Sequence, residues 1–193
     1  MDFFTSDTHF GHVNIIKYCN RPFGSVPEMN ADMIAGWNRR VGPHDTVYHL
    51  GDFALGPRAL WVEYRRQLNG KIVFILGNHD APLGRFQEML LTDDVWCTEY
   101  LYQSSDGLQI SLAHIPPDHD EVRPREGRLL RSNSFPDVKP DLMFCGHVHE
   151  LWRTHPITGC INVGVDRWDY EPKTLDEILA GVSTRASDSE NRL

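Results

Sequence analysis

The chain has 193 residues, enough for one domain with a well-developed core, and its net charge at pH 7 is -8. Such a charge argues against a broad surface for duplex nucleic acid, which needs clustered Lys and Arg. No apolar run approaches the ~20 residues that span a bilayer. We therefore predict one domain at residues 1–182, a polar, flexible tail at 183–193, and no membrane contact.

The first part of the chain repeats a strand, a polar loop and a helix three times. Residues Ser25 and Glu28 have the spacing of a capping box, which marks the start of the second helix. The repeat predicts βαβ units and a mostly parallel sheet with helical cover. The predicted strands cover residues 2–6, 46–50 and 71–76, and the predicted helices cover 14–19, about 26–41 and 57–68.

The second part of the chain lacks the repeat of strand, loop and helix. Residues 96–103 and 108–114 flank a turn at 104–107 and predict a β-hairpin. A long loop rich in Pro and Arg follows at 115–139. Further strands are predicted at 141–145 and 160–164, and a second capping box at 174–177 predicts a short final helix.

The compartment is predicted from the cysteines and from the first residues. Met1–Asp7 lacks the basic region of a secretory signal and leads directly into an apolar stretch. No C-x-x-C pair is present, so the scattered cysteines indicate reduced residues, mostly in the core, of a cytoplasmic protein. These cysteines are Cys19, Cys97, Cys145 and Cys160.

Five of the predicted strands end in short polar motifs. In open α/β sheets ligands bind outside the carboxyl ends of the strands, so we expect these motifs to form one site. Carboxylate, imidazole and amide groups suit Mn, Fe, Zn, Co or Ni. They exceed the needs of one four-coordinate ion and fit two ions that share a carboxylate. The motifs are Asp7-x-His9, Gly51-Asp52, Gly77-Asn78-His79-Asp80, His114 and Gly146-His147-x-His149.

The order of these motifs resembles that of the calcineurin-like metallophosphoesterase superfamily. The motifs run from Asp7 to His149, about three quarters of the chain. The whole chain is similar to small prokaryotic or phage-type phosphoesterases that begin S-D-T-H-F-G-H-x-N-I-I. This resemblance implies an α/β fold, a four-layer metallophosphoesterase β-sandwich of mixed sheets flanked by helices, which agrees with the change from βαβ units to a hairpin.

The resemblance also implies roles for the motif residues. Two divalent ions, with Mn expected, would be bridged by Asp52, and a hydroxide between them would attack phosphorus in line with the leaving oxygen. His79 would act beside the metals as general acid or as donor to the phosphoryl oxygens. The first ion would be bound by Asp7, His9 and His149, and the second by Asn78, His114 and His147.

Each motif also has an ordinary structural interpretation when it is taken alone. Asp80 is better interpreted as a helix cap or a support of the site than as a ligand. The residue types favour a core or supporting role for His49 and a turn role for Asn162. His12 either reaches the substrate phosphate or is a surface residue.

Arginines that could hold a phosphate are concentrated in the loop at 115–139. The loop is either a solvated segment or a lid over the substrate. We select Arg125 as the substrate contact, and Arg21 and Arg167 are weaker candidates. The four arginines of the loop are Arg123, Arg125, Arg128 and Arg131.

The substrate class is predicted from the residues after Gly51-Asp52. The protein Ser/Thr phosphatase branch carries a further Asp and Arg there, and this chain has neither, which argues against a phosphoprotein substrate. The resemblance implies a phosphodiesterase acting on a small nucleotide, with 2′,3′-cyclic nucleotides as candidates. A phosphomonoesterase is the alternative within the enzymes, and a non-catalytic scaffold is the alternative of another class. The sequence leaves the oligomeric state open.

Overall fold

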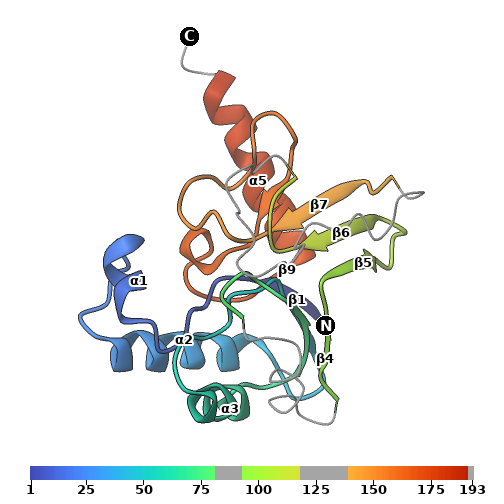
Figure 1. Cartoon of the computed structure of the whole chain (residues 1–193). Helices are drawn as coiled ribbons and strands as arrows, with labels where there is room; N and C mark the ends of the chain where they lie inside the picture. Colours follow the sequence, from blue (N-terminus) through green and yellow to red (C-terminus); the bar gives the residue numbers. More distant parts are fainter. Residues whose placement is uncertain (81–92, 118–138, 191–193) are drawn as a thin grey trace.

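The structure, a computed structural model, describes residues 1–80, 93–117 and 139–190 (Figure 1). Its strands form two sheets. The first sheet contains β1 (Asp2–Thr5), β2 (Thr46–His49), β3 (Lys71–Ile75), β4 (Val95–Cys97) and β9 (Lys173–Thr174). The second contains β5 (Glu99–Gln103), β6 (Gln109–Ala113), β7 (Leu142–Cys145) and β8 (Ile161–Asn162). The helices are α1 (Val13–Tyr18), α2 (Val26–Arg40), α3 (Arg58–Gln67), the 3₁₀ helix η2 (Val165–Arg167) and α5 (Leu175–Glu190).

Both sheets are mixed. In the first sheet the strand order is β4-β3-β2-β1-β9, in which β1 to β4 are parallel and β9 is antiparallel to β1. In the second sheet the order is β5-β6-β7-β8, and only the β5–β6 pair is antiparallel. The fold is therefore the predicted α/β arrangement of mixed sheets with flanking helices.

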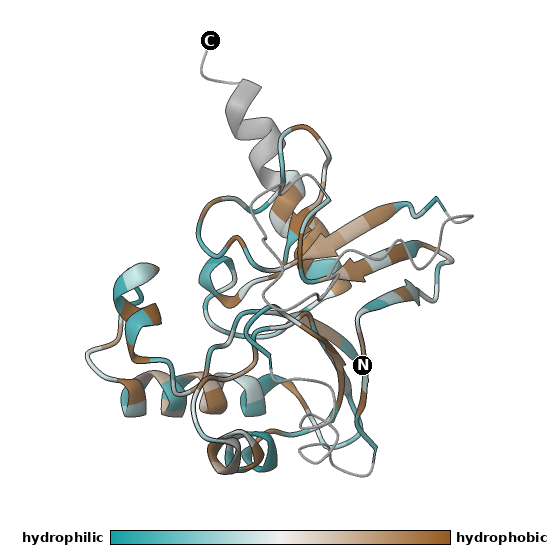
Figure 2. Ribbon diagram, in the orientation of Figure 1, coloured by the Kyte–Doolittle hydropathy of each residue, from teal (hydrophilic) through white to brown (hydrophobic). Residues whose placement is uncertain are grey.

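The first sheet is buried on both faces, as its continuous apolar strands predict. Successive side chains of a strand point to opposite faces, so Ile72 and Phe74 of β3 join the core beneath the helices. Val73 and Ile75 join the core shared with the second sheet. Figure 2 shows the curved strands of the first sheet coloured largely brown, whereas β5 of the second sheet carries hydrophilic positions.

Helices α2 and α3 cover the outer face of the first sheet (Figure 1). Met29, Met33 and Trp37 recur at the spacing of one helical face, and all three are buried in this core. The Ser25 hydroxyl accepts the N–H of Glu28, which confirms the helix start predicted from the sequence.

The core between the two sheets is centred on aromatic rings. The ring of Phe4 lies 5.1 Å from that of Tyr102 and 5.2 Å from that of Phe144, both nearly perpendicular to it. Ile178 of α5 and Trp168 complete this core. The contacts join β1 of the first sheet to β5 and β7 of the second.

Two predictions about the elements are corrected. Residues 96–103 do not form one strand: the chain bends at Thr98, with β4 parallel to β3 in the first sheet and β5 antiparallel to β6 in the second. A continuous β-type pattern does not reveal a change of sheet, because Trp96 and Cys97 before the bend and Tyr102 after it all pack against the cores. The final helix, α5, is longer than predicted and continues through the polar residues to Glu190. No helix among the described residues is long and apolar enough to cross a membrane.

Candidate metal centre

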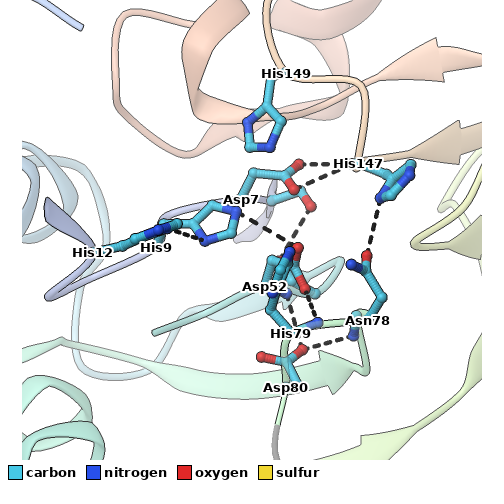
Figure 3. A network of polar contacts seen from close by, with 12 residues as sticks. Asp7, His9, His12, Asp52, Asn78, His79, Asp80, His147 and His149 are labelled. Carbon is cyan, nitrogen blue, oxygen red and sulfur yellow. Dashed lines mark hydrogen bonds and ion pairs between the residues drawn. The ribbon is translucent and has the colours of Figure 1, made fainter. Parts of the chain in front are cut away.

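The loops that follow β1, β2, β3, β6 and β7 converge at the carboxyl ends of these strands (Figure 3). They approach so closely that three of the motif positions, all glycines, have no room for a side chain. A Cβ atom on Gly146 would overlap Ser6 and the Asp7 carboxylate, one on Gly77 would overlap Asp52, and one on Gly51 would overlap Gly77 and the His114 ring. The backbone of these glycines therefore lies directly against the neighbouring polar loops.

The backbone of these loops adopts the left-handed region at an unusual number of positions. Eight non-glycine residues in the described ranges have positive φ, and five of them are predicted ligands. Left-handed backbone costs free energy for such residues, and it clusters at functional sites where the surroundings enforce it. The five are Asp7 (58°), His9 (49°), Asp52 (56°), His147 (71°) and His149 (47°).

One group of potential ligands consists of Asp7, His9 and His149, whose ligand atoms all lie within 4.8 Å of one another. The Nε2 atom of His9 is buried and has no hydrogen-bond partner. A buried polar atom without a partner is rare in proteins and calls for a ligand. The donor set and this orphaned nitrogen both fit a divalent metal ion.

A second group lies beside the first and contains Asp52, His114 and His147. The Oδ1 atom of Asn78 lies 2.9 Å from Nε2 of His114 and 2.9 Å from Nδ1 of His147, so the amide oxygen points into the same group. The carbonyl oxygen of Leu50, 2.7 Å away, accepts from Nδ1 of His114 and thereby directs Nε2 toward the site.

Asp52 lies between the two groups. Its Oδ2 atom is 3.5 Å from Nε2 of His9 and 3.5 Å from Nε2 of His114, and its Oδ1 atom accepts the N–H of His79 at 2.8 Å. One carboxylate oxygen therefore faces a histidine from each group. This is the position that a carboxylate shared by two ions would take.

The buried carboxylates favour positive charge on two histidines of this region, whereas burial lowers the pKa of His9. Burial alone would raise the pKa of Asp52, but His114 and His9 outweigh burial and hold it below its ordinary value. Burial opposes protonation of His114, but Asp52 outweighs it and raises the pKa of His114 to about 9. For His149, the hydrogen bond to Asp166 outweighs burial and raises the pKa to about 11. A bound cation would meet the same favourable field.

His79 lies at the edge of the two ligand groups and belongs to neither (Figure 3). It is exposed, and its ring lies 5.6 Å from that of His9. His12 is half-buried, with its ring 5.2 Å from that of His9. Both imidazoles are thus near the centre while remaining accessible to a substrate.

Asp80 holds together the loops that follow β2 and β3. Its carboxylate accepts the N–H groups of Gly77 at 2.6 Å, Asp52 at 2.9 Å and Phe53 at 3.0 Å. It thereby fastens the loop after β2 to the loop after β3. Of the two roles that the sequence left open for Asp80, these contacts are those of a supporting residue.

Asn162 makes the local side-chain hydrogen bond of a turn residue, to the N–H of Gly164, and it also contacts distant backbone. It is fully buried at the end of β8, where its amide donates to the carbonyl oxygens of His149 at 2.8 Å and Trp152 at 2.9 Å. Its Oδ1 atom accepts the N–H of Gly164 at 2.8 Å. Asn162 therefore anchors the loop that carries His149, which a lone Asn before a glycine does not reveal.

The arginine predictions have different outcomes. Arg125 and its neighbours at 123, 128 and 131 lie outside the described residues. Arg21 is a correction: it is buried, and its guanidinium binds Asp166 and the carbonyl oxygens of Asp7 and Thr8. It is therefore committed to the protein rather than to a substrate. Arg167 donates to the carbonyl oxygen of Glu150.

Asp166 is the residue of this region that the sequence analysis missed. Its side chain is 1% exposed, and Oδ2 lies 3.0 Å from Nδ1 of His149. No spacing rule connects it to His149, which is 17 residues earlier. The only signal is a carboxylate directly after the buried run from Cys160 to Val165, a position where an unpaired charge would be costly.

The chain is similar to known proteins in both sequence and structure. The family model of the calcineurin-like phosphoesterase superfamily domain matches residues 3–173. The uncharacterized protein MJ1445 of Methanocaldococcus jannaschii is 36% identical over 176 residues, covering 90% of this chain and 86% of that protein. The Gene 66 protein of Mycobacterium phage L5 is 30% identical over 186 residues, covering 86% of each. The crystal structure of AQ665 from Aquifex aeolicus, a protein of unknown function, has a TM-score of 0.69 and 28% identity, covering 92% of this chain and 97% of that one.

Proposed function

Because the chain belongs to the calcineurin-like phosphoesterase superfamily, we propose that it is a phosphodiesterase with two divalent metal ions, Mn by preference. Its substrates are small phosphodiesters of nucleotides, such as 2′,3′-cyclic nucleotides. The observation that carries the proposal is the position of Asp52, whose Oδ2 atom lies 3.5 Å from a histidine of each ligand group. One shared carboxylate between two donor sets is the arrangement of a dinuclear site.

The donor sets divide the predicted ligands between the two ions. Bound divalent ions lower the pKa of a coordinated water and stabilise charge on the phosphoryl oxygens. The described groups support the predicted division. Asp7, His9 and His149 would hold the first ion, His114, His147 and Asn78 the second, and Asp52 both.

The protein's own residues supply positioning and proton transfer. His79 is exposed beside Asp52 and belongs to neither donor set, so its imidazole is free to protonate the leaving alkoxide. The hydrogen bond from its backbone N–H to Asp52 holds this residue at the edge of the site. His12, on the other side of His9, is placed to donate a hydrogen bond to the phosphate.

Two features favour a nucleotide diester over a phosphomonoester. A monoester carries up to two negative charges, and the guanidinium of Arg21, which contacts the backbone of Asp7 and Thr8, is already bound to Asp166. Tyr18 is 67% exposed, and its ring lies 6.3 Å from that of His12, nearly perpendicular to it. An exposed aromatic ring beside a phosphate contact offers a surface on which a base can stack.

We also propose a cytoplasmic location, because all four cysteines are free thiols. No second copy of the chain is required for the site, since every ligand in the two donor sets comes from one chain.

The test is a substrate screen with Mn-loaded protein. Bis-p-nitrophenyl phosphate, p-nitrophenyl phosphate and the four 2′,3′-cyclic nucleotides are assayed beside chelated protein and Asp52→Asn. We expect turnover of the diesters, loss of turnover on chelation, and little turnover by the variant. Faster turnover of the monoester would replace the proposal with a phosphomonoesterase. If the protein binds metal but turns over none of these esters, the alternative of a non-catalytic scaffold is favoured.

A further inference from the structure

We propose that the buried Arg21–Asp166 pair is a positioning device for the metal centre, in which Asp166 orients the His149 ring and Arg21 holds Asp166 in place. This inference rests on the proposed function, because it concerns metal binding at the same site. It assigns a task to two residues that are not ligands and that come from distant parts of the chain.

The first step is the contact between Asp166 and His149. Oδ2 of Asp166 lies 3.0 Å from Nδ1 of His149, and the Asp166 side chain is 1% exposed. With Nδ1 engaged, Nε2 is the nitrogen that remains for Asp7 and His9 on the other side of the ring. A carboxylate that binds one nitrogen of a histidine fixes the orientation of the other.

The second step is the reason why His149 needs such support. It lies in the loop after β7, its backbone φ is 47°, and its side chain is 21% exposed. A partly exposed ring on a left-handed loop has several accessible orientations. Its direction toward the ligand group is therefore set by the residues that it contacts.

The third step is the set of hydrogen bonds that Arg21 donates. Its Nε and Nη2 atoms donate to the two oxygens of Asp166 at 2.7 and 3.0 Å, a bidentate pair with no rotational freedom. The same guanidinium donates to the carbonyl oxygen of Asp7 at 2.7 Å and to that of Thr8 at 3.0 Å. One side chain thus joins the loop that carries Asp7 and His9 to the carboxylate that orients His149.

An alternative is that Asp166 is itself a ligand. The ligand atoms of Cys19, His149 and Asp166 lie within 4.8 Å of one another and could form a third metal group. Both Asp166 oxygens, however, already accept hydrogen bonds from a guanidinium. A cation there would lie against the charge of Arg21, so the geometry favours orientation over coordination.

The chain offers a matched control in a second buried arginine pair. Arg65 binds Asp94 through Nε and Nη2, both at 2.7 Å, and the exposed fractions of the two side chains are 2% and 0%. This pair joins α3 to the start of β4, and its further hydrogen bonds in the described part of the chain are to the backbone of Leu68, Gly70 and Ile72. Asp94→Asn therefore removes the same chemistry at a place where metal binding is not expected to change.

The experiment compares Asp166→Asn and Asp94→Asn with the unaltered protein. Metal content is measured by elemental analysis, Mn affinity by titration calorimetry, and stability by thermal unfolding of the chelated proteins. Both variants should lose stability, because each weakens a buried pair. Only Asp166→Asn should weaken the binding of one Mn ion, by about 10–100-fold. Arg21→Lys, which keeps the charge but loses the bidentate grip, should weaken the same ion to a smaller extent and serves if Asp166→Asn does not fold.

The outcomes separate this inference from the proposed function. If the unaltered protein binds two ions and Asp166→Asn binds them equally well, the inference fails and the proposed function stands. An equal loss of affinity in Asp94→Asn would show a general effect of stability and also overturn the inference. A third bound ion that is lost in Asp166→Asn would make Asp166 a ligand. Failure of the unaltered protein to bind any metal would overturn the proposed function itself.

Discussion

Side chains of the same type perform different tasks at this site because their other atoms have different partners. Asp52 and Asp80 are both buried carboxylates. Asp80 accepts three backbone N–H groups, and it holds the loops together. Asp52 accepts one backbone N–H at Oδ1 and directs Oδ2 toward His9 and His114. Residue type therefore defines the chemistry that is available, and the local contacts decide its use.

His79→Ala tests the separation of proton transfer from metal binding. The variant should keep its metal content, because His79 belongs to neither donor set, and lose about 10²–10⁴-fold in kcat with the loss of a general acid. Metal content and steady-state kinetics measure the two effects. His44→Ala, at an exposed position before the amino end of β2 and thus at the end of the strand opposite the site, is the control and should match the unaltered protein. Loss of metal in His79→Ala would assign His79 to the ligands instead.

His49 provides a test of pH dependence at a buried histidine that is not a predicted ligand. It is fully buried: the ring stacks against Trp37, and Nε2 lies 3.0 Å from the hydroxyl of Thr8. Because that hydroxyl donates to the carbonyl oxygen of Phe53, Nε2 of His49 donates to it, and Nδ1 has no hydrogen-bond partner. Burial lowers the pKa of His49 to about 3 from an ordinary 6.5.

The sign of the effect follows from proton binding. Between pH 6.5 and 3 the unfolded chain binds a proton at His49 and the folded protein does not, so the stability present above pH 6.5 is lost as the pH falls through this range. At pH 5 the loss is about 2 kcal/mol. His49→Phe should unfold with a smaller dependence on pH in denaturant titrations of chelated protein. If the free energy of unfolding changed equally with pH in the two proteins, this account would be contradicted.

At the scale of the elements, the backbone hydrogen bonds that pair β1 with β2 continue into the loops that follow these strands. Beyond the paired residues of β1 and β2, the N–H groups of Asp7, His9 and Phe10 donate to the carbonyl oxygens of Gly51, Asp52 and Phe53, each at 3.0 Å. The loops that carry these predicted ligands are therefore hydrogen-bonded to each other as extensions of the sheet. Helices α2 and α3 lie on the outer face of the first sheet, where they stabilise it without contributing a ligand.

Ser25→Ala tests this division between helix and site. The Ser25 hydroxyl accepts the N–H of Glu28, and the Glu28 carboxylate accepts the N–H of Gly24 at 2.9 Å. Removal of the cap should lower the unfolding free energy by about 1 kcal/mol and leave the metal content unchanged. Chemical denaturation and elemental analysis measure the two. Ser105→Ala, an exposed serine of the hairpin turn, should change neither.

At the scale of the whole molecule, the candidate centre joins the two sheets. The loops of the first sheet supply Asp7, Asp52 and Asn78, whereas those of the second supply His114, His147 and His149. Metal ions bound between them would act as cross-links between the sheets. The same arrangement places negative carboxylates against histidines from the opposite sheet, which holds the loops together without metal.

Metal removal is therefore expected to destabilise the fold. At a free metal concentration 100-fold above the dissociation constant, each ion should stabilise the protein by about 2.7 kcal/mol. Chelation should lower the melting temperature by several degrees for each ion, and Mn should restore it. Scanning calorimetry of loaded, chelated and reloaded protein measures this. The melting temperature of Asp52→Asn should rise less on addition of Mn. A melting temperature of the unaltered protein that does not change on chelation would contradict the idea that the ions cross-link the two sheets.

The sequence by itself determined the βαβ half of the fold, the helix starts and the chemical types at the site. Apolar runs, capping residues and polar motifs after strands are local signals, and each reports a local preference. The family membership implied by the motif order is confirmed. The residue roles within the site remain predictions, and the structure supports them by bringing Asp7, Asp52 and their histidine neighbours together.

Only the tertiary structure decided the change of sheet at Thr98, the anchoring role of Asn162 and the link from Arg21 to Asp166. The two members of that pair are 145 residues apart, and neither belongs to a motif. Their partnership arises because the chain closes around the site and buries both charges in one place. A buried charge requires its counterpart, but the sequence does not state which of the many distant candidates the fold will bring to it.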